Sequence, residues 1–235
     1  MTRARIAVLA SGTGTNLQAI LDYFDRLGER RAGEVVLVAS DRAQAGALAR
    51  ARARGIAAEA VAPTSAMKER ATLSALIDAQ SPDFIVLAGY LRLVPLEVVR
   101  RYAGRMLNVH PALLPAFGGA GMYGRRVHEA VLDAGVKVTG VTAHFVDEEY
   151  DRGTIIAQWP VTVRAGDDAD TLAARVLRVE HLLFPRVVDA VARGRVTLAS
   201  CREGRAFVDD ENLSFSLLPQ EDACLAENMD RALGC

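Results

Sequence analysis

Asn108 and His110 are the side chains in this sequence that most directly suggest chemistry. They lie in the short apolar run Met106–His110, and in a β-strand the alternation of side chains puts both on one face. Pro111, which has no backbone N–H, follows at once, so the strand should end there. The pattern predicts an amide donor beside a titratable imidazole at the carboxyl end of a strand, where ligands bind in open α/β sheets.

Two further residues could join this pair. His144 lies in the Val- and Thr-rich run 137–146, and Asp151 ends the acidic turn that follows it. A carboxylate beside His110 favours the imidazolium form, so we expect Asp151 to raise the pKa of His110. Together with the Asn108 amide, this would form an oxyanion site. No serine or cysteine near the histidine in sequence suggests a covalent nucleophile, so the pattern is typical of direct transfer to an amine.

The glycine-rich segment 12–16 is a second candidate binding element. It stands between the first apolar run and the first helical pattern, where unpaired backbone N–H groups and the helix dipole favour an anion such as phosphate. It lacks the Lys of a P-loop and the full spacing of the dinucleotide fingerprint. Taken alone, the segment fits a phosphate site or a tight turn without a ligand, and both readings stay open.

The elements that must position these residues alternate between strands and helices. Buried strands are predicted at 5–10, 34–40, 56–61, 84–88 and 106–110, and helices from 17, at 45–54, from 65 to about 80, and at 96–102. Such alternation builds a mostly parallel sheet with right-handed crossovers. We therefore predict an α/β fold, a doubly wound and Rossmann-like sheet with helices on both faces.

The second half of the chain continues the pattern less regularly. A loop with four glycines, 116–124, precedes a helix at 126–134, strands at 137–146 and 154–163, and a helix capped by Asp170 or Thr171 and broken at Pro185. Pro160 suggests that the last of these strands lies near an edge. Runs 196–200 and 205–208 read as a hairpin. We expect one domain, 1–208, and a weakly ordered, irregular extension, 209–235.

Composition excludes several classes of protein. With 235 residues, 51% hydrophobic and 24% charged, and a net charge of −1, the chain resembles an ordinary globular domain without the basic character of a nucleic-acid or membrane binder. No apolar stretch approaches a membrane span and no leader is visible, so we expect a cytoplasmic protein. The three cysteines, which are late and far apart, fit neither a disulfide framework nor a zinc site.

Several other polar or aromatic residues are predicted to have ordinary roles. Trp159 should pack on the sheet. Arg50, Arg52 and Arg54 alternate by two on a helix and so should spread around it in solvent. His128 is expected to be an exposed helix residue, and His181 to be structural.

Four motifs occurring in this order resemble the phosphoribosylglycinamide formyltransferase family, folate-dependent enzymes of purine synthesis. They are Ser11-Gly-Thr-Gly-Thr-Asn16-Leu-Gln-Ala-Ile20, Asn108-Val-His110-Pro-Ala-Leu-Leu-Pro115, Gly140-Val-Thr-Ala-His144-Phe-Val and Asp151-x-Gly153. The resemblance runs from about residue 6 to about residue 195. It implies transfer of a formyl group from 10-formyltetrahydrofolate to the amine of the glycinamide ribotide, without a metal.

The resemblance also implies residue roles. Asn108 and His110 would bind the formyl oxygen, Asp151 would raise the pKa of His110 and help to move the amine proton, and His144 would support them. The ribotide would be bound by Gly12, Thr13, Gly14, Thr15 and Asn16 at its phosphate and by Glu180 at its ribose. Folate would contact Leu91, Arg92, Leu93, Val94, Asn108, Asp147, Glu148, Glu149, Tyr150 and Asp151.

This sequence departs from the family pattern at three places. Loop 116–124 is longer than in the shorter members, with Ala120 where similar sequences often carry Lys. Leu177 stands where a polar residue often helps to bind the phosphate, leaving Arg178 or nothing in its place. The arginine expected to meet the folate glutamate has no clear equivalent, and Lys68 and Arg70 are candidates.

Rival functions share part of this pattern. Methionyl-tRNA formyltransferase should carry a basic C-terminal domain, and formyltetrahydrofolate deformylase an N-terminal regulatory domain; neither is visible in this sequence. A non-catalytic phosphate-binding protein would have no reason to present amide, imidazole and carboxylate at one edge. We expect small-molecule substrates, no nucleic-acid or membrane partner, and a monomer or weak homodimer.

Overall fold

The computed structural model describes residues 2–61, 66–202 and 222–233. The chain divides into two compact units, Met1–Asn108 and Val109–Cys235, and each is described on its own. Among the helices of the described ranges, none is both long and apolar enough to cross a membrane.

The first unit is built on a parallel sheet. Its strands are β1 (Ala4–Leu9), β2 (Gly33–Ser40), β3 (Ala57–Ala60) and β4 (Phe84–Leu87), and the first residues of β5 (Met106–His110) pair with β4. β1 is central, since it pairs in parallel with both β2 and β4. Ile6, Val8 and Leu9 are fully buried, because a strand covered by helices on both faces has no solvent side.

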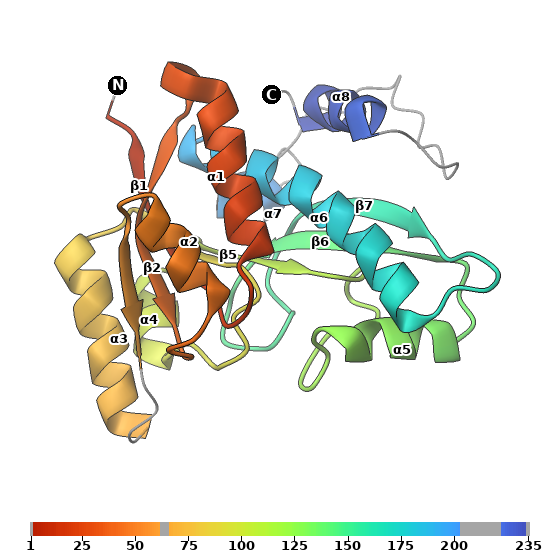
Figure 1. Ribbon diagram of the computed structural model, residues 1–235, viewed down its shortest axis with the longest axis horizontal. Coiled ribbons are helices and arrows are strands. Elements are labelled where there is room, and N and C mark those ends of the chain that lie inside the picture. The colour runs from red at the N-terminus through yellow and green to blue at the C-terminus, as the bar shows by residue number, and fades with distance from the viewer. Residues whose placement is uncertain (1, 62–65, 203–221, 234–235) are drawn as a thin grey trace. The chain divides into compact units, whose positions relative to one another are not determined.

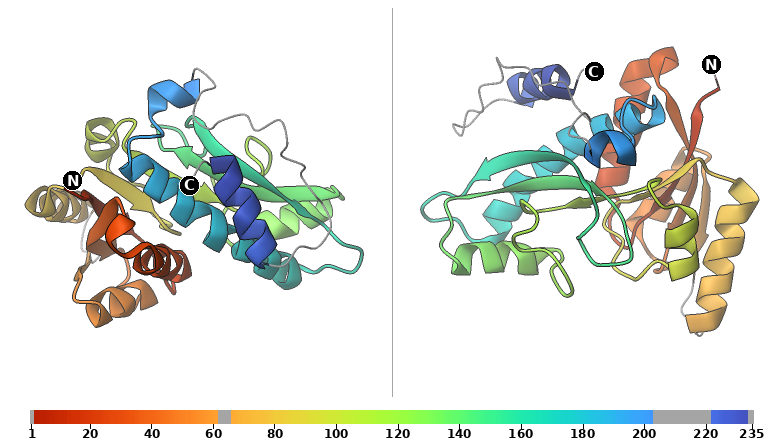
Figure 2. Two further views of the ribbon diagram at one scale, coloured as in Figure 1. Left: turned by 90° about the horizontal axis from the view of Figure 1, so that it is seen from above. Right: turned by 180° about the vertical axis from the view of Figure 1, so that it is seen from behind.

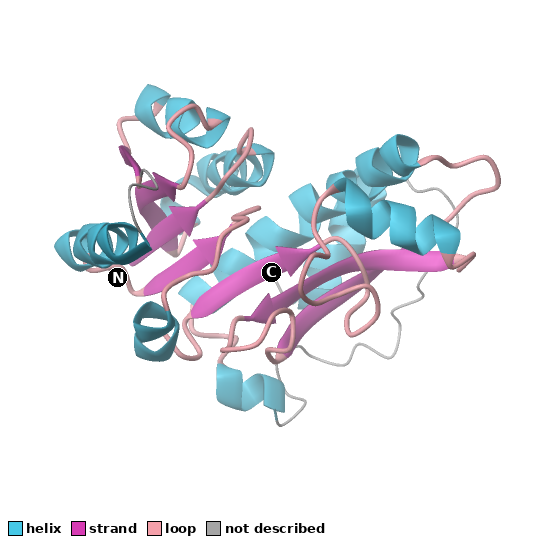
Figure 3. Cartoon of the chain, turned by 90° about the horizontal axis from the view of Figure 1, so that it is seen from below, coloured by secondary structure: helices cyan, strands magenta, loops and turns pink. Residues whose placement is uncertain are grey.

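Helices cover both faces of this sheet. They are α1 (Thr15–Leu27), the short 3₁₀ helix η1 (Gly28–Arg30), α2 (Gly46–Ala53), α3 (Ala66–Gln80) and α4 (Leu96–Arg101). In Figure 3, α1 and α2 lie on one side of the strands and α3 and α4 on the other, as right-handed crossovers require when the strand order reverses at β1. α1 buries the apolar stripe that its spacing predicted, including Leu17, Ile20 and Phe24.

The second unit combines a two-stranded antiparallel ladder with helices of different lengths. β6 (Val138–Phe145) and β7 (Ile155–Thr162) pair antiparallel, and the helices are α5 (Arg125–Asp133), α6 (Ala169–Ala192), α7 (Leu198–Arg202) and α8 (Asp222–Leu233). α6 packs on both strands and also contacts α5 and α8. Figures 1 and 2 show α8 running beside α6.

The strand order confirms the predicted fold class. Across the chain it is β3-β2-β1-β4-β5-β6-β7, which gives a mostly parallel, doubly wound sheet with helices on both faces. β7 is an edge strand, as Pro160 predicted, and Pro160 stands opposite Gly140 in the ladder. Trp159 is buried, as expected.

Helix α6 differs from the prediction at two points. Its N-cap is Asp168, whose carboxylate accepts from the Thr171 amide in a capping box, so the cap is not Asp170 or Thr171. Pro185 does not break the helix. Phe184 and Val187, on either side of Pro185, are both fully buried, and their packing offsets the loss of one backbone hydrogen bond.

The C-terminal part also differs. The strand predicted at 196–200 is wrong, because α7 starts at Leu198 with Thr197 and Ser200 exchanging side-chain-to-backbone hydrogen bonds; run 205–208 lies outside the described residues. The expectation of an irregular tail fails over α8, where Met229 is fully buried and Asp230 pairs with Arg186. Residues 209–221 lie outside the described part of the chain.

Candidate active site

Asp151 lies between two buried histidines in the second unit. Its Oδ2 is 3.5 Å from Nδ1 of His110, and its Oδ1 is 3.6 Å from Nε2 of His144. The two histidines are 3% and 2% exposed, respectively. The structure therefore brings together three of the residues that the sequence singled out, in an environment where charges are weakly screened.

A short turn after β6 delivers the carboxylate. A side chain on Gly153 would overlap the carbonyl oxygen of Phe145, since its Cβ would lie 1.7 Å from that atom. The chain can therefore close tightly only with glycine there, and the Phe145 amide bonds the Thr154 carbonyl across the turn. Asp151 itself has a φ of 54°, in the left-handed region that non-glycine residues seldom adopt. The Asp151-x-Gly153 spacing thus reflects the geometry that aims the carboxylate.

The glycine-rich loop 116–124 contacts the same group from the other side. The Phe117 carbonyl accepts a hydrogen bond of 2.8 Å from Nε2 of His110, and the Gly119 amide donates to Oδ2 of Asp151 over 2.9 Å. A Cβ on Gly118 would lie 2.4 Å from the Leu114 side chain. The loop is therefore part of the site, holding both its imidazole and its carboxylate.

The start of this loop is held by β6. The Thr142 hydroxyl, fully buried, donates to the Ala112 carbonyl at 2.7 Å and accepts from the Leu114 amide at 3.0 Å. Gln158 on β7 donates both to the Leu114 carbonyl and to the same hydroxyl. These bonds fix the chain directly after His110, and so they fix where the loop begins.

The pKa of His110 lies below its ordinary value of 6.5. Burial is the largest cause; the nearby Asp151 charge and the Phe117 carbonyl raise the pKa, and the His144 charge lowers it. The sequence-based expectation of a raised pKa is therefore wrong in its net direction, because it counted the carboxylate without the burial. Both ring nitrogens nevertheless face oxygen atoms, Nε2 the Phe117 carbonyl and Nδ1 the Asp151 carboxylate, so a proton on either nitrogen has an acceptor.

Asp151 is shifted so as to stay ionised. Burial alone would raise its pKa, but the interactions with His144, the Gly119 amide and His110 together lower it below the ordinary 3.8. The site thus holds a buried negative charge beside a ring that gains a proton readily when further negative charge develops nearby.

The second unit also holds the predicted residues 147–150 and Glu180. Asp147, Glu148, Glu149 and Tyr150 form the exposed turn before Asp151. The Asp147 carboxylate accepts from the Glu149 amide at 3.0 Å, which orders the turn. Glu180, in the middle of α6, is only 7% exposed.

The first unit holds the other predicted groups. Gly12 and Thr13 are exposed between β1 and α1, and Gly14 has a φ of 77°, which favours glycine. Asn16 is buried at the start of α1. Asn108 is half-buried on β5 and stands opposite Leu87. It lies two residues before His110, so the two residues share one face of the strand.

The apolar loop after β4 adjoins the glycine turn. The Leu91 amide donates to the Ser11 hydroxyl over 2.8 Å. Leu91 and Leu93 are 42% and 69% exposed, Arg92 is also exposed, and Val94 is buried. A loop that leaves large apolar side chains in solvent is typical of a ligand-binding surface.

Residues 4–188 match the family model described as Formyl transferase. The chain belongs to this family. The match spans both units and ends before α7 and α8.

A plant relative and a bacterial relative carry the same enzyme name. The chain is 43% identical over 199 residues to the chloroplastic phosphoribosylglycinamide formyltransferase of Arabidopsis thaliana, covering 83% of this chain and 67% of that protein. It is 38% identical over 211 residues to phosphoribosylglycinamide formyltransferase of Escherichia coli, covering 88% of this chain and 95% of that protein. The crystal structure of glycinamide ribonucleotide transformylase 1 from Symbiobacterium toebii has a TM-score of 0.75 at 43% identity, covering 83% of this chain and 90% of that one.

Some sequence-based readings of single residues do not hold. His128 is not exposed: it is 4% exposed on α5, and its Nδ1 has no hydrogen-bond partner within the described ranges. Burial and the charge of His110 both lower the pKa of His128. All three arginines expected in solvent have specific contacts: Arg54 pairs with Asp22 and Asp25, Arg50 contacts the glycine turn, and Arg52 donates to the Ala58 carbonyl.

The candidates for a folate glutamate partner stay open. The side chains of Lys68 and Arg70 lie outside the described residues. No group of three or more His, Cys, Asp or Glu that could hold a metal ion occurs in the described part of the chain.

Proposed function

We propose that this protein transfers the formyl group of 10-formyltetrahydrofolate to the amine of phosphoribosylglycinamide. The observation that carries the proposal is Asp151, held ionised between two buried histidines with no nucleophile in the group. Such a group can polarise a carbonyl and accept a proton, which is what transfer to an amine requires. The shared name of the relatives supports the same reaction.

In the proposed reaction the substrate amine attacks the formyl carbon, and a new C–N bond forms while the carbonyl electrons move onto oxygen. The Asn108 amide and His110 would stabilise this oxyanion. The intermediate then collapses, the bond from carbon to N10 of the folate breaks, and N10 takes up a proton. The amine loses one proton, for which Asp151, directly or through water, is the acceptor.

His110 has to change partners during this reaction. Its Nε2 is bonded to the Phe117 carbonyl and its Nδ1 faces Asp151, so the formyl oxygen would replace one of these acceptors. As negative charge develops on that oxygen, the pKa of His110 would rise from its lowered starting value. The ring would then take up a proton from water as the transition state forms, and the resulting imidazolium would face the developing negative charge.

The binding roles follow the family resemblance. The turn 12–16 would hold the ribotide phosphate, and Glu180 the ribose hydroxyls. The loop 91–94, Asn108 and the turn 147–151 would line the folate site, with 10-formyltetrahydrofolate as cosubstrate and no metal. Residues 1–208 would work as one domain with 209–235 as an extension, in a cytoplasmic monomer or weak homodimer; the Arabidopsis relative is named chloroplastic.

The direct test mixes the purified protein with 10-formyltetrahydrofolate and either the ribotide or buffer. We expect formylated ribotide, with one tetrahydrofolate per product, and no free formate above the buffer control. Formate released without the ribotide would instead indicate a deformylase. Binding of the ribotide without any product would indicate a non-catalytic binding protein, and either result would reject the proposal.

A further inference from the structure

The glycine turn of the first unit is held from behind by helix α2. The Ala47 amide donates to the Gly12 carbonyl at 3.2 Å. Nε of Arg50, one turn further along the same helix, donates to the Thr13 carbonyl at 2.8 Å. Two successive carbonyl groups of the turn therefore point toward α2.

This orientation determines where the amides of the turn point. In a trans peptide the C=O and the following N–H lie on opposite sides, and among the described residues the cis peptide is Leu114–Pro115. The amides of Thr13 and Gly14 must therefore point away from α2, both in the same general direction. Successive N–H groups aligned in this way, with a left-handed residue at Gly14, form a concave site that favours an anion.

Two glycines allow the helix to come this close. A Cβ on Gly14 would lie 2.6 Å from Cα of Ala47, and a Cβ on Gly46 would lie 2.9 Å from the Thr13 carbonyl oxygen. Both distances are too short for a real side chain. The contact between the turn and α2 is thus built into the backbone, and Arg50 is the side chain that adds to it.

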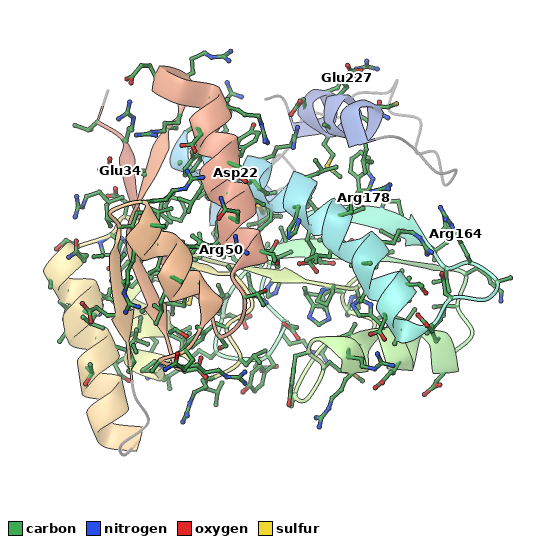
Figure 4. All side chains as sticks on the ribbon, in the orientation of Figure 1. Asp22, Glu34, Arg50, Arg164, Arg178 and Glu227 are labelled. Atoms are coloured by element: carbon green, nitrogen blue, oxygen red, sulfur yellow. The ribbon has the colours of Figure 1, made fainter. Side chains whose placement is uncertain are left out.

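Arg50 is also fixed at a second point. Its Nη1 donates to Oε1 of Gln18 on α1 at 3.0 Å, and Gln18 in turn donates to Asp22. Figure 4 shows Arg50 extending from α2 beside α1. A guanidinium carries five N–H donors in a rigid fork, so one side chain can hold both the turn and the first part of the helix that follows it.

We propose that Arg50 is a positioning residue for phosphate binding: by holding the Thr13 carbonyl, it keeps the Thr13 and Gly14 amides aimed at the ribotide phosphate. The inference rests on the proposed function, which puts the phosphate at this turn. It adds a residue that does not itself touch the substrate and a helix, α2, that serves as the support of the site.

The test compares two substrates that differ only in the phosphate. Arg50→Met removes the donors and the charge while keeping an unbranched apolar chain. We expect kcat/KM for the ribotide to fall about tenfold, the loss typical of one hydrogen bond from a charged group. The value for the phosphate-free glycinamide nucleoside and the KM for folate should stay within about twofold. Arg52→Met is the matched control, since Arg52, on the same helix, donates to the Ala58 carbonyl and is exposed.

Three outcomes would overturn the positioning role. The first is an equal loss with both substrates, which would show that Arg50 merely stabilises the fold. The second is no loss with either substrate. The third is an Arg50→Lys variant that prefers the phosphorylated substrate as strongly as the wild type does. Lysine keeps the positive charge but lacks the guanidinium, so this result would show that the charge alone suffices.

A separate variant tests the site on which the inference rests. Gly12 is exposed with no atom near the place of a Cβ, so Gly12→Asp adds a carboxylate to the turn without a clash. This variant should weaken binding of the ribotide and leave binding of the phosphate-free nucleoside unchanged. If Gly12→Asp leaves ribotide binding unchanged, the phosphate lies elsewhere and the proposed function of the turn fails. If Gly12→Asp weakens ribotide binding but Arg50→Met does not, only the role of Arg50 fails.

Discussion

Replacing Asp151 with Asn removes the negative charge that lies between the two buried histidines, and the new side chain has nearly the same shape. An Asn side-chain oxygen can still accept from the Gly119 amide, so the loop keeps its attachment. What disappears is the attraction between the carboxylate and a protonated His110. We expect turnover to fall strongly, and the pKa of His110, already lowered by burial, to fall further.

The size of the effect follows from the distance. Two unit charges 3.5 Å apart interact by about 5 kcal/mol at an effective dielectric constant of about 20. Removing one member of a buried charged pair usually costs about 2–5 kcal/mol. If about 3–4 kcal/mol of this is expressed in the transition state, kcat falls by a factor of about a hundred to a thousand.

The assay measures kcat and KM for both substrates, the ribotide affinity by calorimetry, and the titration of the His110 ring by NMR. Ribotide affinity should change little, because the phosphate is proposed to bind at the separate turn 12–16. Asp133→Asn is the matched control: it removes a carboxylate from an exposed position at the end of α5.

Two results would refute this reasoning. Turnover of Asp151→Asn within threefold of wild type would show that the carboxylate has no role in the chemical step. A fall in turnover with an unchanged His110 titration would show that Asp151 acts as a proton acceptor only, and that the electrostatic link between carboxylate and imidazole is not what matters.

Three further predictions concern stability. Gly153→Ala forces a Cβ to within 1.7 Å of the Phe145 oxygen; urea unfolding should show a loss of about 3 kcal/mol or more, and an unchanged midpoint would contradict the turn geometry. Asp230→Ala leaves the buried Arg186 guanidinium without this partner; since the Asp230 side chain is 42% exposed, we expect a loss of about 1–2 kcal/mol. Asp167, with its pKa lowered to about 2, stabilises the fold by about 2 kcal/mol above pH 4; this is lost as the pH falls toward 2, and Asp167→Asn should remove that dependence from acid titrations.

Matched variants separate these effects from general sensitivity. Glu227→Ala removes an exposed carboxylate from α8 and should leave the unfolding midpoint unchanged. Asp170→Asn removes an exposed carboxylate near Asp167, and the acid limb of the stability curve should survive it. Equal effects in the matched pairs would contradict the contacts assigned to Asp230 and Asp167.

The sequence predicts most of the fold because its apolar runs are short, buried and regularly separated by helical patterns. The meeting of Asp151 with His110 and His144 is also predicted, since each residue follows or ends a strand and polar groups gather at strand ends. Neither prediction depends on how deeply the residues are buried. The pKa of His110 does depend on its burial, so a prediction that considers only the carboxylate gives the wrong direction for the pKa shift.

The misread residues show what local patterns leave out. His128 stands next to Val127 and one turn before Val131, both fully buried on α5, yet its polar character alone suggested solvent. Arg50 lies four residues after Gly46, so the two share a helix face; small residues at the start of a helix, opposite a glycine turn, are the signal that could have identified it. In α8 the spacing of Leu225 and Met229 by four residues would have predicted an amphipathic helix.

Because of the Thr142 hydroxyl, selection for a folded protein and selection for activity should favour different residues at this position. Valine has almost the same shape and is favoured in buried strands, so Thr142→Val should preserve the sheet. It would nevertheless leave the Ala112 carbonyl and the Leu114 amide without this partner, and Gln158 would keep only its bond to the Leu114 carbonyl of the two described above. A screen for folded protein would accept this variant while a screen for purine-independent growth would reject it, so the two selections acting on one side chain can be separated.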